Sequence, residues 1–211
     1  TLLSKKVSDA IICCDDVKIL KVAKKYNAKA ILTSKHHVNG TDRICEVFKN
    51  IKKKYDLVVD VQGDEPLISP IHIDKVIDHH FKNIKYDIVL PNLKVRSVNN
   101  TNLVKIVSNL KNEVLYISRA NVPYEFKKNV KYLKKHLSVI SFKPESLIKF
   151  GKSRRSELEK IEDIELLRAL DIGLKIKTLN LSGDSFSIDI FDDYLKAKGS
   201  ISKDRYFKFY K

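Results

Sequence analysis

The chain has 211 residues, 43% of them hydrophobic, which is enough for one α/β domain with a buried core and excludes a disordered chain. It carries 41 lysines and arginines against 26 acids, a formal net charge of +15. This surplus favours an anionic partner such as a nucleic acid, a phospholipid headgroup or a nucleotide, but the charge does not choose among these.

The cysteines and the apolar runs exclude several further classes of protein. Cys13, Cys14 and Cys45 form no CxxC pair and have no histidine at ligand spacing beside them, so neither a disulfide framework nor a zinc site is predicted. No stretch approaches the roughly 18–20 apolar residues of a membrane span, and the first residues lack the layout of a signal peptide. We expect a soluble protein with reduced thiols.

In the first third of the chain, short runs rich in β-branched residues alternate with helical patterns, which is typical of βαβ units around a mostly parallel sheet. Asp15 and Asp16 predict the start of a helix that ends near Asn27, Thr41 predicts the cap of a second helix, and Pro70 predicts the start of a third. The expected strands are residues 10–14, 30–32 and 57–61.

The remaining strands are expected at residues 88–90, 104–107, 115–117, 137–142, 175–179 and 186–189. Residues 121–135 are rich in lysine and show little helical periodicity, which suits an extended arm or hairpin. A helix over residues 158–170 is predicted to stop at Gly173, and a last helix begins at Phe191. We find no repeat or linker, so residues 1–211 are expected to form a single domain.

Two acidic residues follow predicted strands and are candidate ligands of a cation. Asp64 comes after Gly63 at the end of the strand at 57–61, and Asp189 ends the strand at 186–189. The crevice beyond the carboxyl ends of strands is where open α/β sheets bind ligands, and paired carboxylates with phosphates and water are the usual magnesium shell. Each residue taken singly is explained as well by capping, Asp64 of a loop and Asp189 of the helix at Phe191.

A resemblance to a known family rests on motifs spread over nearly the whole chain. Residues 62–68 read Gln-Gly-Asp-Glu-Pro-Leu-Ile, which resembles the signature of the CMP-Kdo synthetases, the 3-deoxy-manno-octulosonate (Kdo) cytidylyltransferases. Other motifs of that family are matched in the same order: S-G-T-[DE]-R at 39–43, P-N-x-V-K-V-V at 102–107, F-S-R-A at 117–120, the start of H-L-G-I-Y at 136–137, L-E-x-x-E-x-L-E-Q-L-R at 158–168, and V-D at 188–189.

The resemblance implies a Rossmann-like, mostly parallel sheet flanked by helices, with the nucleotidyltransferase architecture that is similar to the glycosyltransferase A fold. The implied reaction is attack of a sugar-acid oxygen on the α-phosphorus of CTP, which yields CMP-Kdo for lipopolysaccharide biosynthesis and releases pyrophosphate. By similarity, Asp64 and Asp189 are the catalytic residues that hold Mg²⁺, and Gly40, Thr41 and Arg43 lie on the nucleotide side.

The same resemblance assigns residues to the sugar. Arg119 would pair with the sugar carboxylate, and Gln62, His136 and Glu165 would hydrogen-bond its hydroxyls. A surface ion pair for Arg119, a strand-edge position for His136 and a solvated helix position for Glu165 are the alternatives. His36, His72, His79 and His80 match no functional position and are expected to be exposed.

Parts of the family pattern are not found in this chain. No counterpart of the basic phosphate-binding loop A-R-x-x-S-x-R-L-P-x-K occurs, and Thr1 aligns within the helix after it, so we expect an N-terminally truncated chain that turns over little by itself. In the sugar motifs, Ile140 replaces a tyrosine, Ser138 a glycine and Leu166 a glutamine. The sugar is therefore less securely assigned than the reaction.

Residues 121–135 correspond to the family's dimer contact, so we expect a homodimer. A sialic acid cytidylyltransferase is the enzymatic alternative, although residues 62–66 argue against it. The non-enzymatic alternatives are a catalytically dead homologue and a basic nucleic-acid-binding module. Only residues 205–211 interleave aromatic and basic side chains, so nucleic acid is not the expected partner. We expect a cytoplasmic location and leave an organellar one open.

Overall fold

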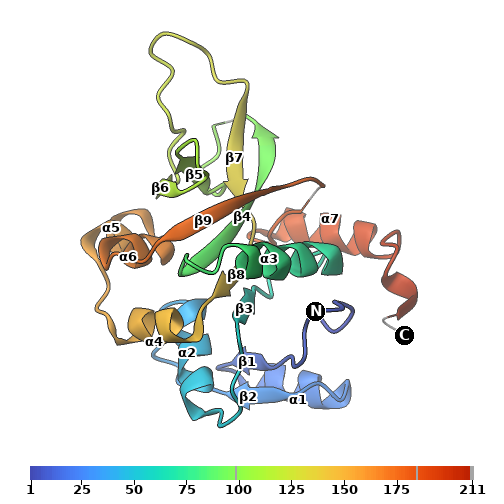
Figure 1. Ribbon diagram of the computed structural model, residues 1–211. Helices are drawn as coiled ribbons and strands as arrows, with labels where there is room; N and C mark the ends of the chain where they lie inside the picture. The colour runs from blue at the N-terminus through green and yellow to red at the C-terminus, as the bar shows by residue number, and fades with distance from the viewer. Residues whose placement is uncertain (98, 184, 210–211) are drawn as a thin grey trace.

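The computed structural model describes residues 1–97, 99–183 and 185–209, in which a central sheet carries helices on both faces (Figure 1). Hydrogen bonds connect the strands of this sheet in the order β3 (Val58–Val61), β8 (Val139–Phe142), β4 (Ile88–Arg96), β7 (Tyr132–His136), β5 (Lys105–Ser108) and β6 (Val114–Ser118), and β9 (Ile176–Leu181) also pairs with β4. The α/β class is confirmed.

The strand directions correct the expectation of a mostly parallel sheet. Among the described strands of this sheet, only β4 and β9 pair in parallel, and the other pairings are antiparallel. Strands β7 and β8 are separated by residues 137–138 alone and pair with the same edge of β4. Strand β8 thereby enters between β3 and β4 against their direction, which a buried apolar run does not reveal in the sequence.

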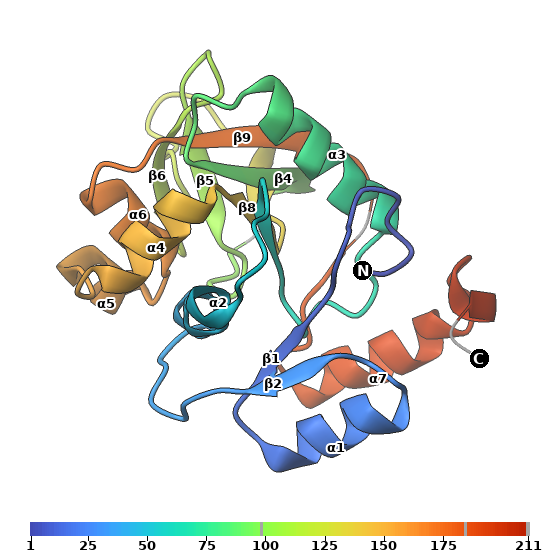
Figure 2. The same cartoon turned by 60° about the horizontal axis from the view of Figure 1, so that its bottom comes forward.

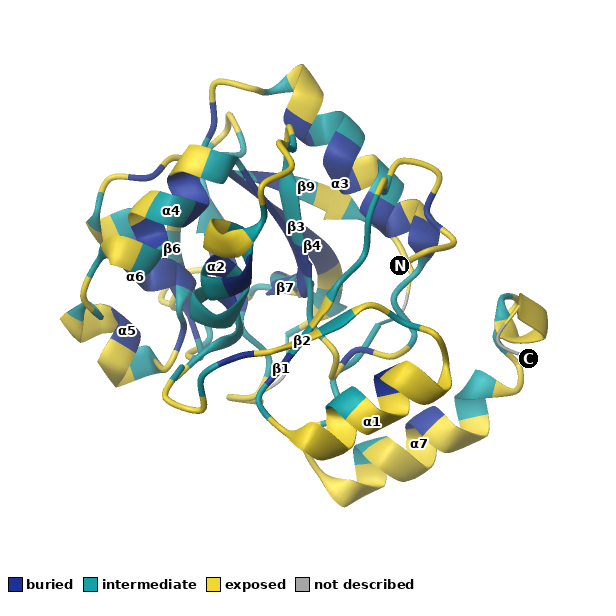
Figure 3. Cartoon of the chain, turned by 90° about the horizontal axis from the view of Figure 1, so that it is seen from below, coloured by how far each residue is buried: buried dark blue, intermediate teal, exposed yellow. Residues whose placement is uncertain are grey.

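Alternating residues of the central strands bury two separate cores. On one face, Val89 and Val139 pack against helix α3 (Pro70–Lys82), which begins at Pro70 as predicted. On the other face, Ile88 and Phe142 pack with residues of α4 (Pro144–Lys152) and α6 (Leu166–Asp171). Figure 3 shows buried strands between more exposed helices. Helix α4 was not predicted from the sequence.

A small second sheet lies apart from the central one (Figure 2). Its strands β1 (Ile12–Cys14) and β2 (Ala30–Leu32) pair in parallel and are joined by α1 (Val17–Lys25). Asp16 caps this helix by accepting a hydrogen bond from the Lys18 N–H at 2.7 Å, as predicted. The βαβ unit is thus present, but its strands do not pair with the strands of the central sheet that the structure describes.

Several boundaries differ from the sequence prediction. Helix α2 (Gly40–Asn50) is capped by Asn39 instead of Thr41, because the Asn39 side chain accepts the Asp42 N–H. The helix predicted over 158–170 is two helices, α5 (Glu157–Glu162) and α6, separated at Asp163, whose φ of 49° breaks the helical path. Residues 186–189 form no strand, although α7 (Phe191–Ile201) follows as predicted.

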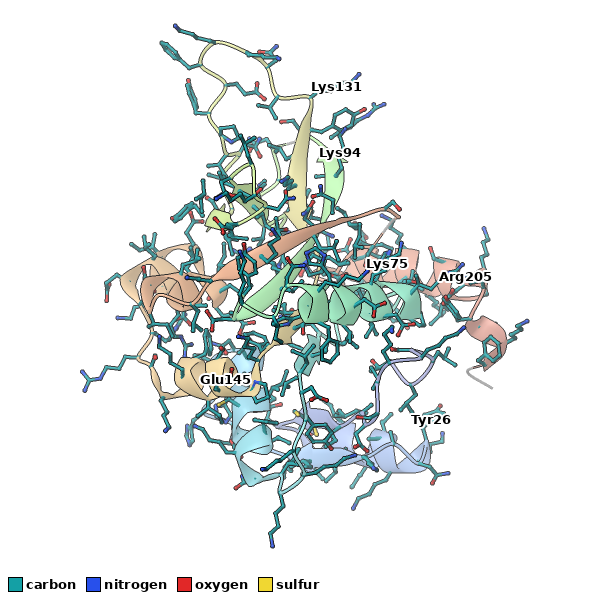
Figure 4. The ribbon with its side chains drawn as sticks, in the orientation of Figure 1. Tyr26, Lys75, Lys94, Lys131, Glu145 and Arg205 are labelled. Atoms are coloured by element: carbon teal, nitrogen blue, oxygen red, sulfur yellow. The ribbon has the colours of Figure 1, made fainter. Side chains whose placement is uncertain are left out.

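Residues 121–131, within the predicted arm at 121–135, form an irregular excursion that stands away from the body of the molecule (Figure 1). Tyr124 and Phe126 are 84% and 83% exposed on it. Lys131 points outward where this segment meets β7 (Figure 4). The rest of the predicted arm is β7 itself.

The histidines differ from the expectation of exposure. His80 is fully buried between the Ser141 hydroxyl, 2.8 Å from its Nδ1, and the Tyr86 carbonyl, while His72 is buried against the Ser182 carbonyl. Both lie on the apolar side of α3, where a periodic pattern alone does not distinguish a core histidine from a surface one. His36 is exposed as predicted.

All three cysteines are free thiols, as expected. No helix among the described residues combines the length and apolarity needed to cross a bilayer. The predicted aromatic and basic stretch at 205–211 contains a short 3₁₀ helix, Phe207–Phe209, and its last two positions lie outside the described residues.

Candidate active site

A cleft of about 1510 Å³ lies between the small sheet, the end of β3 and the segment that precedes α7. Its walls include residues from β1, β3, β7 and the beginnings of α2 and α6. The predicted site residues that line it are Gly40, Arg43, Gln62, Asp64, Arg119, His136, Glu165 and Asp189. The fold therefore brings together side chains that are up to more than a hundred positions apart in the sequence.

Asp64 and Asp189 are placed side by side by the backbone. The Ile188 N–H donates a hydrogen bond to the Asp64 carbonyl at 2.9 Å, which fixes the segment before α7 against the end of β3. Burial raises the pKa of Asp64, and the negative charges of Glu65 and Asp189 raise it further. A cation between the carboxylates would oppose that repulsion. Among the described residues, no group of three or more histidines, cysteines or acids is arranged around a common metal position.

Glu65 supports this end of the cleft and was not singled out in the sequence. It is 3% exposed, and its carboxylate accepts hydrogen bonds from the Ser138 N–H at 3.3 Å and the Ser185 hydroxyl at 2.5 Å. Glu65 thus ties β3 to the β7–β8 junction and to the segment that carries Asp189. Its position inside the Gln-Gly-Asp-Glu-Pro motif was the only signal in the sequence.

His136 presents an unused nitrogen at the cleft. Its Nε2 is buried and has no hydrogen-bond partner in the described part of the chain. Burial lowers the pKa of His136 to about 4, so the ring is neutral at pH 7. A neutral imidazole can donate or accept one hydrogen bond at that nitrogen, which suits a hydroxyl group of a ligand.

The N-terminus of α2 differs from the predicted anion site. Thr41 is fully buried and does not line the cleft, and its N–H donates to the Glu165 carboxylate at 3.1 Å. Arg43 donates to Asp15 at 2.8 Å and to the Thr33 hydroxyl at 2.7 Å. The Glu165 carboxylate therefore lies at the N-terminus of α2, where we expected a substrate anion to bind.

Glu165 also contacts Gln62, whose side-chain amide donates to it at 3.4 Å. Burial raises the pKa of Glu165, and it raises the pKa of the neighbouring Asp60 as well. Asp60 is 3% exposed and its Oδ2 has no partner among the described residues. Asp60 was not singled out from the sequence, because strand β3 carries it within an otherwise apolar run.

Arg119 lies at the rim of the cleft and is already held by the chain. Its guanidinium donates to the carbonyls of Glu162 at 2.7 Å, Asp163 at 3.0 Å and Thr101 at 3.3 Å. The buried Lys105 ammonium in turn donates to the Arg119 carbonyl. Since a guanidinium has five N–H donors, part of its capacity is left for a ligand.

A buried ionic network under α2 was also missed. Arg168 is 2% exposed and donates to both carboxylate oxygens of Asp42, at 2.8 and 2.9 Å, and to Glu159 at 2.7 and 2.8 Å. Its guanidinium stacks 4.2 Å from the centre of the Phe150 ring. The network joins α2 to α5 and α6, and so holds Glu165 against the start of α2.

Of the residues that depart from the family motifs, Ile140 and Leu166 pack in the main core at 0% and 2% exposure. Ser138 lies at the cleft beside Glu65. The substitutions for tyrosine and glutamine therefore replace polar groups by apolar side chains that belong to the core.

Comparison with solved structures defines the class of fold. A CMP:2-keto-3-deoxy-manno-octonic acid synthetase, solved in complex with CTP, matches with a TM-score of 0.87 and 23% identity over 96% of this chain and 84% of its own. HddC from Yersinia pseudotuberculosis follows at a TM-score of 0.64 and 14% identity, over 92% of this chain and 79% of its own. The chain has a nucleotidyltransferase fold.

Sequence comparison then gives the family. The cytidylyltransferase family profile matches residues 1–176. The 3-deoxy-manno-octulosonate cytidylyltransferase of Nitratiruptor sp. is 34% identical over 93% of this chain and 85% of its own length, and that of Fusobacterium nucleatum is 36% identical over 85% and 74%. The chain belongs to the cytidylyltransferase family, among the 3-deoxy-manno-octulosonate enzymes.

Proposed function

We propose that this protein transfers CMP from CTP to Kdo. In that reaction a hydroxyl oxygen of the sugar bonds to the α-phosphorus, the bond to the β-phosphate breaks, and pyrophosphate leaves. Such a transfer needs positioning and charge neutralisation more than covalent help from the protein. The observation that carries the proposal is that Asp64 and Asp189 lie close together in one cleft. The chain's relatives are named for this activity.

The residues at this end of the cleft fit a magnesium ion. Asp64 and Asp189 would hold it through carboxylate oxygens, with phosphate oxygens and water completing a shell that a protein rarely fills alone. When bound, Mg²⁺ supplies neutralisation of the charge on the triphosphate. Glu65 helps to hold Asp189 near Asp64, because its carboxylate accepts a hydrogen bond from Ser185 in the segment that leads to Asp189.

The sugar and the nucleotide divide the rest of the cleft. His136 offers its free Nε2 to a hydroxyl, and Gln62, whose amide donates to Glu165, lines the same cleft. Arg119 offers the remaining guanidinium donors to the sugar carboxylate at the rim. Gly40 and Arg43 face the nucleotide, while Glu165 acts by fixing the start of α2 in addition to contacting the sugar.

The test is pyrophosphate release by the product of the full gene with CTP, Kdo and Mg²⁺. The expected result is turnover that needs all three, and a loss of roughly 10²–10³-fold or more in Asp64→Asn, the size seen when one stabiliser of transition-state charge is removed. Asp192→Asn, an exposed change in the first turn of α7, is the matched control and retains activity.

Activity that survives Asp64→Asn would contradict the metal assignment. Product formed from sialic acid and none from Kdo would show that the protein is a sialic acid cytidylyltransferase. A folded gene product that forms no CTP-dependent product with either sugar would favour a catalytically dead homologue.

We further propose a homodimer in which residues 121–131 contact the partner. Tyr124 and Phe126 expose large aromatic surface on a segment that leaves the body of the molecule, a pattern typical of interfaces. Sedimentation equilibrium is expected to give a dimer for the wild type and a monomer for the double variant Tyr124→Ser, Phe126→Ser. A monomeric wild type would contradict this.

A further inference from the structure

Lys135 is a buried cation for which the established motifs give no role. It lies on β7 and is 6% exposed, yet none of the ion pairs formed by the described residues includes it. Lysines are rarely buried this far without a paired charge, because removing an ammonium group from water is costly. Its partner is the Ser185 carbonyl, to which Nζ donates at 3.0 Å.

The Lys135 ammonium group has unused N–H donors and lies at the cleft. An ammonium carries three N–H donors, and one of them reaches Ser185. Lys135 lines the cleft together with Asp64 and Asp189, and its positive charge acts on Asp64. The neighbouring Lys134 has the opposite orientation, since alternate residues of a strand face opposite sides, and donates to the Ser108 hydroxyl at 2.6 Å outside the cleft.

We propose that Lys135 is a substrate-binding residue whose ammonium group takes an anionic oxygen, of a phosphate or a carboxylate, at the metal end of the cleft. This inference rests on the proposed function, whose two substrates carry those two groups: CTP its triphosphate and Kdo its carboxylate. The group bound there would complete the neutralisation that Asp64 and Ser185 begin, and would explain why the chain keeps a lysine buried between them.

The test measures binding of CTP alone and of Kdo alone by isothermal titration calorimetry, for wild type, Lys135→Gln and Lys134→Gln. Glutamine retains a donor for the Ser185 carbonyl but carries no charge. The expected result is about tenfold or more weaker binding of one of the two anions to Lys135→Gln, the size of a lost charge-assisted contact. Lys134→Gln is expected to bind both as the wild type does.

Weaker CTP binding identifies a phosphate, and weaker Kdo binding identifies the carboxylate. Wild-type affinity of Lys135→Gln for both anions would overturn the proposal. If Lys135→Gln does not fold, acetylation of the wild-type protein followed by mass spectrometry gives the answer. A saturating anion is expected to slow modification of Lys135 and not of Lys134, and equal rates at Lys135 with and without each anion would overturn the proposal.

Pyrophosphate release by the wild type separates this inference from the proposed function. Wild-type turnover with unchanged binding by Lys135→Gln defeats the inference alone. A wild type that binds neither CTP nor Kdo defeats both.

Discussion

The two ends of the cleft treat charge in opposite ways. At the α2 end, Arg43 pairs with Asp15, Glu165 caps Thr41, and Arg168 neutralises Asp42. At the β3 end, Asp64, Asp189 and Lys135 lie together without an ion pair within the described part of the chain, and His136 keeps a free nitrogen. The first end is held by internal pairing, whereas the second keeps charged and polar groups for a ligand. Rigid support and reactive groups are thus separated along one cleft.

The largest effect is expected where internal pairing is removed. Arg168→Met leaves Asp42 without its cation and leaves the buried Glu159 carboxylate, 1% exposed, with the half-buried Arg155 alone. Breaking a buried pair in this way costs about 3–5 kcal/mol of unfolding free energy. Denaturant titration followed by circular dichroism measures it. Lys160→Met, which breaks the exposed pair with Glu157, is the control and is expected to cost less than about 0.5 kcal/mol.

A stability loss for Arg168→Met no larger than that of the Lys160 control would show that the α2 end is not held by this network. The contrast between the two ends would then lose its physical basis.

A smaller effect is expected from loosening the support of the ligand end. Glu65→Ala removes both acceptor oxygens, the one for the Ser138 N–H and the one for the Ser185 hydroxyl, and so is expected to displace the segment carrying Asp189. The expected loss is roughly 10–100-fold in Mn²⁺ affinity and turnover, as for outer-shell groups of metal sites. The exposed Glu145→Ala on α4 is the control. Unchanged Mn²⁺ affinity in the Glu65 variant would remove Glu65 from the site.

The smallest effect concerns the pH dependence of stability. The pKa of His136 is lowered from 6.5 to about 4 in the folded protein by burial. Between these values the unfolded chain binds a proton that the folded chain does not, so stability falls as the pH falls from 6.5 to 4. His136→Gln is expected to remove this contribution, which amounts to about 1 kcal/mol between pH 7 and pH 5.5.

Unfolding free energies measured at pH 7 and pH 5.5 test this for wild type and His136→Gln. Lys134→Gln, two positions earlier on the same strand and outside the cleft, is expected to keep the wild-type difference between the two pH values. Parallel pH curves for wild type and His136→Gln would show that His136 titrates alike in the folded and unfolded chains.

Much of the fold follows from local signals in the sequence. Asp16 and Pro70 define helix starts because capping and a fixed φ act within a few residues. Strand runs such as Ala30–Leu32 are bounded by polar residues and fold as predicted. The direction of β8 was not predictable in this way, because it depends on the short link after β7 and on which edge of β4 remains free.

Residue types and motifs predicted which residues form the candidate site, but they did not predict the contacts that these residues make. Asp64 and Asp189 meet through a backbone hydrogen bond that no local pattern encodes. Glu165 was predicted to face the sugar, but its carboxylate also caps Thr41, a contact made across more than a hundred positions. Lys135 was predicted to lie in a lysine-rich extended arm, because the strand alternation that turns it inward becomes visible only once β7 is placed.

Binding of Mn²⁺ in the presence of CTP, followed by electron paramagnetic resonance, tests the joint role of Asp64 and Asp189 most directly. The account predicts one tight site in the wild type that Asp64→Asn and Asp189→Asn each weaken by about tenfold or more, with no further loss of comparable size in the double variant. Wild-type affinity in either single variant, or two independent losses that add, would contradict a shared cation.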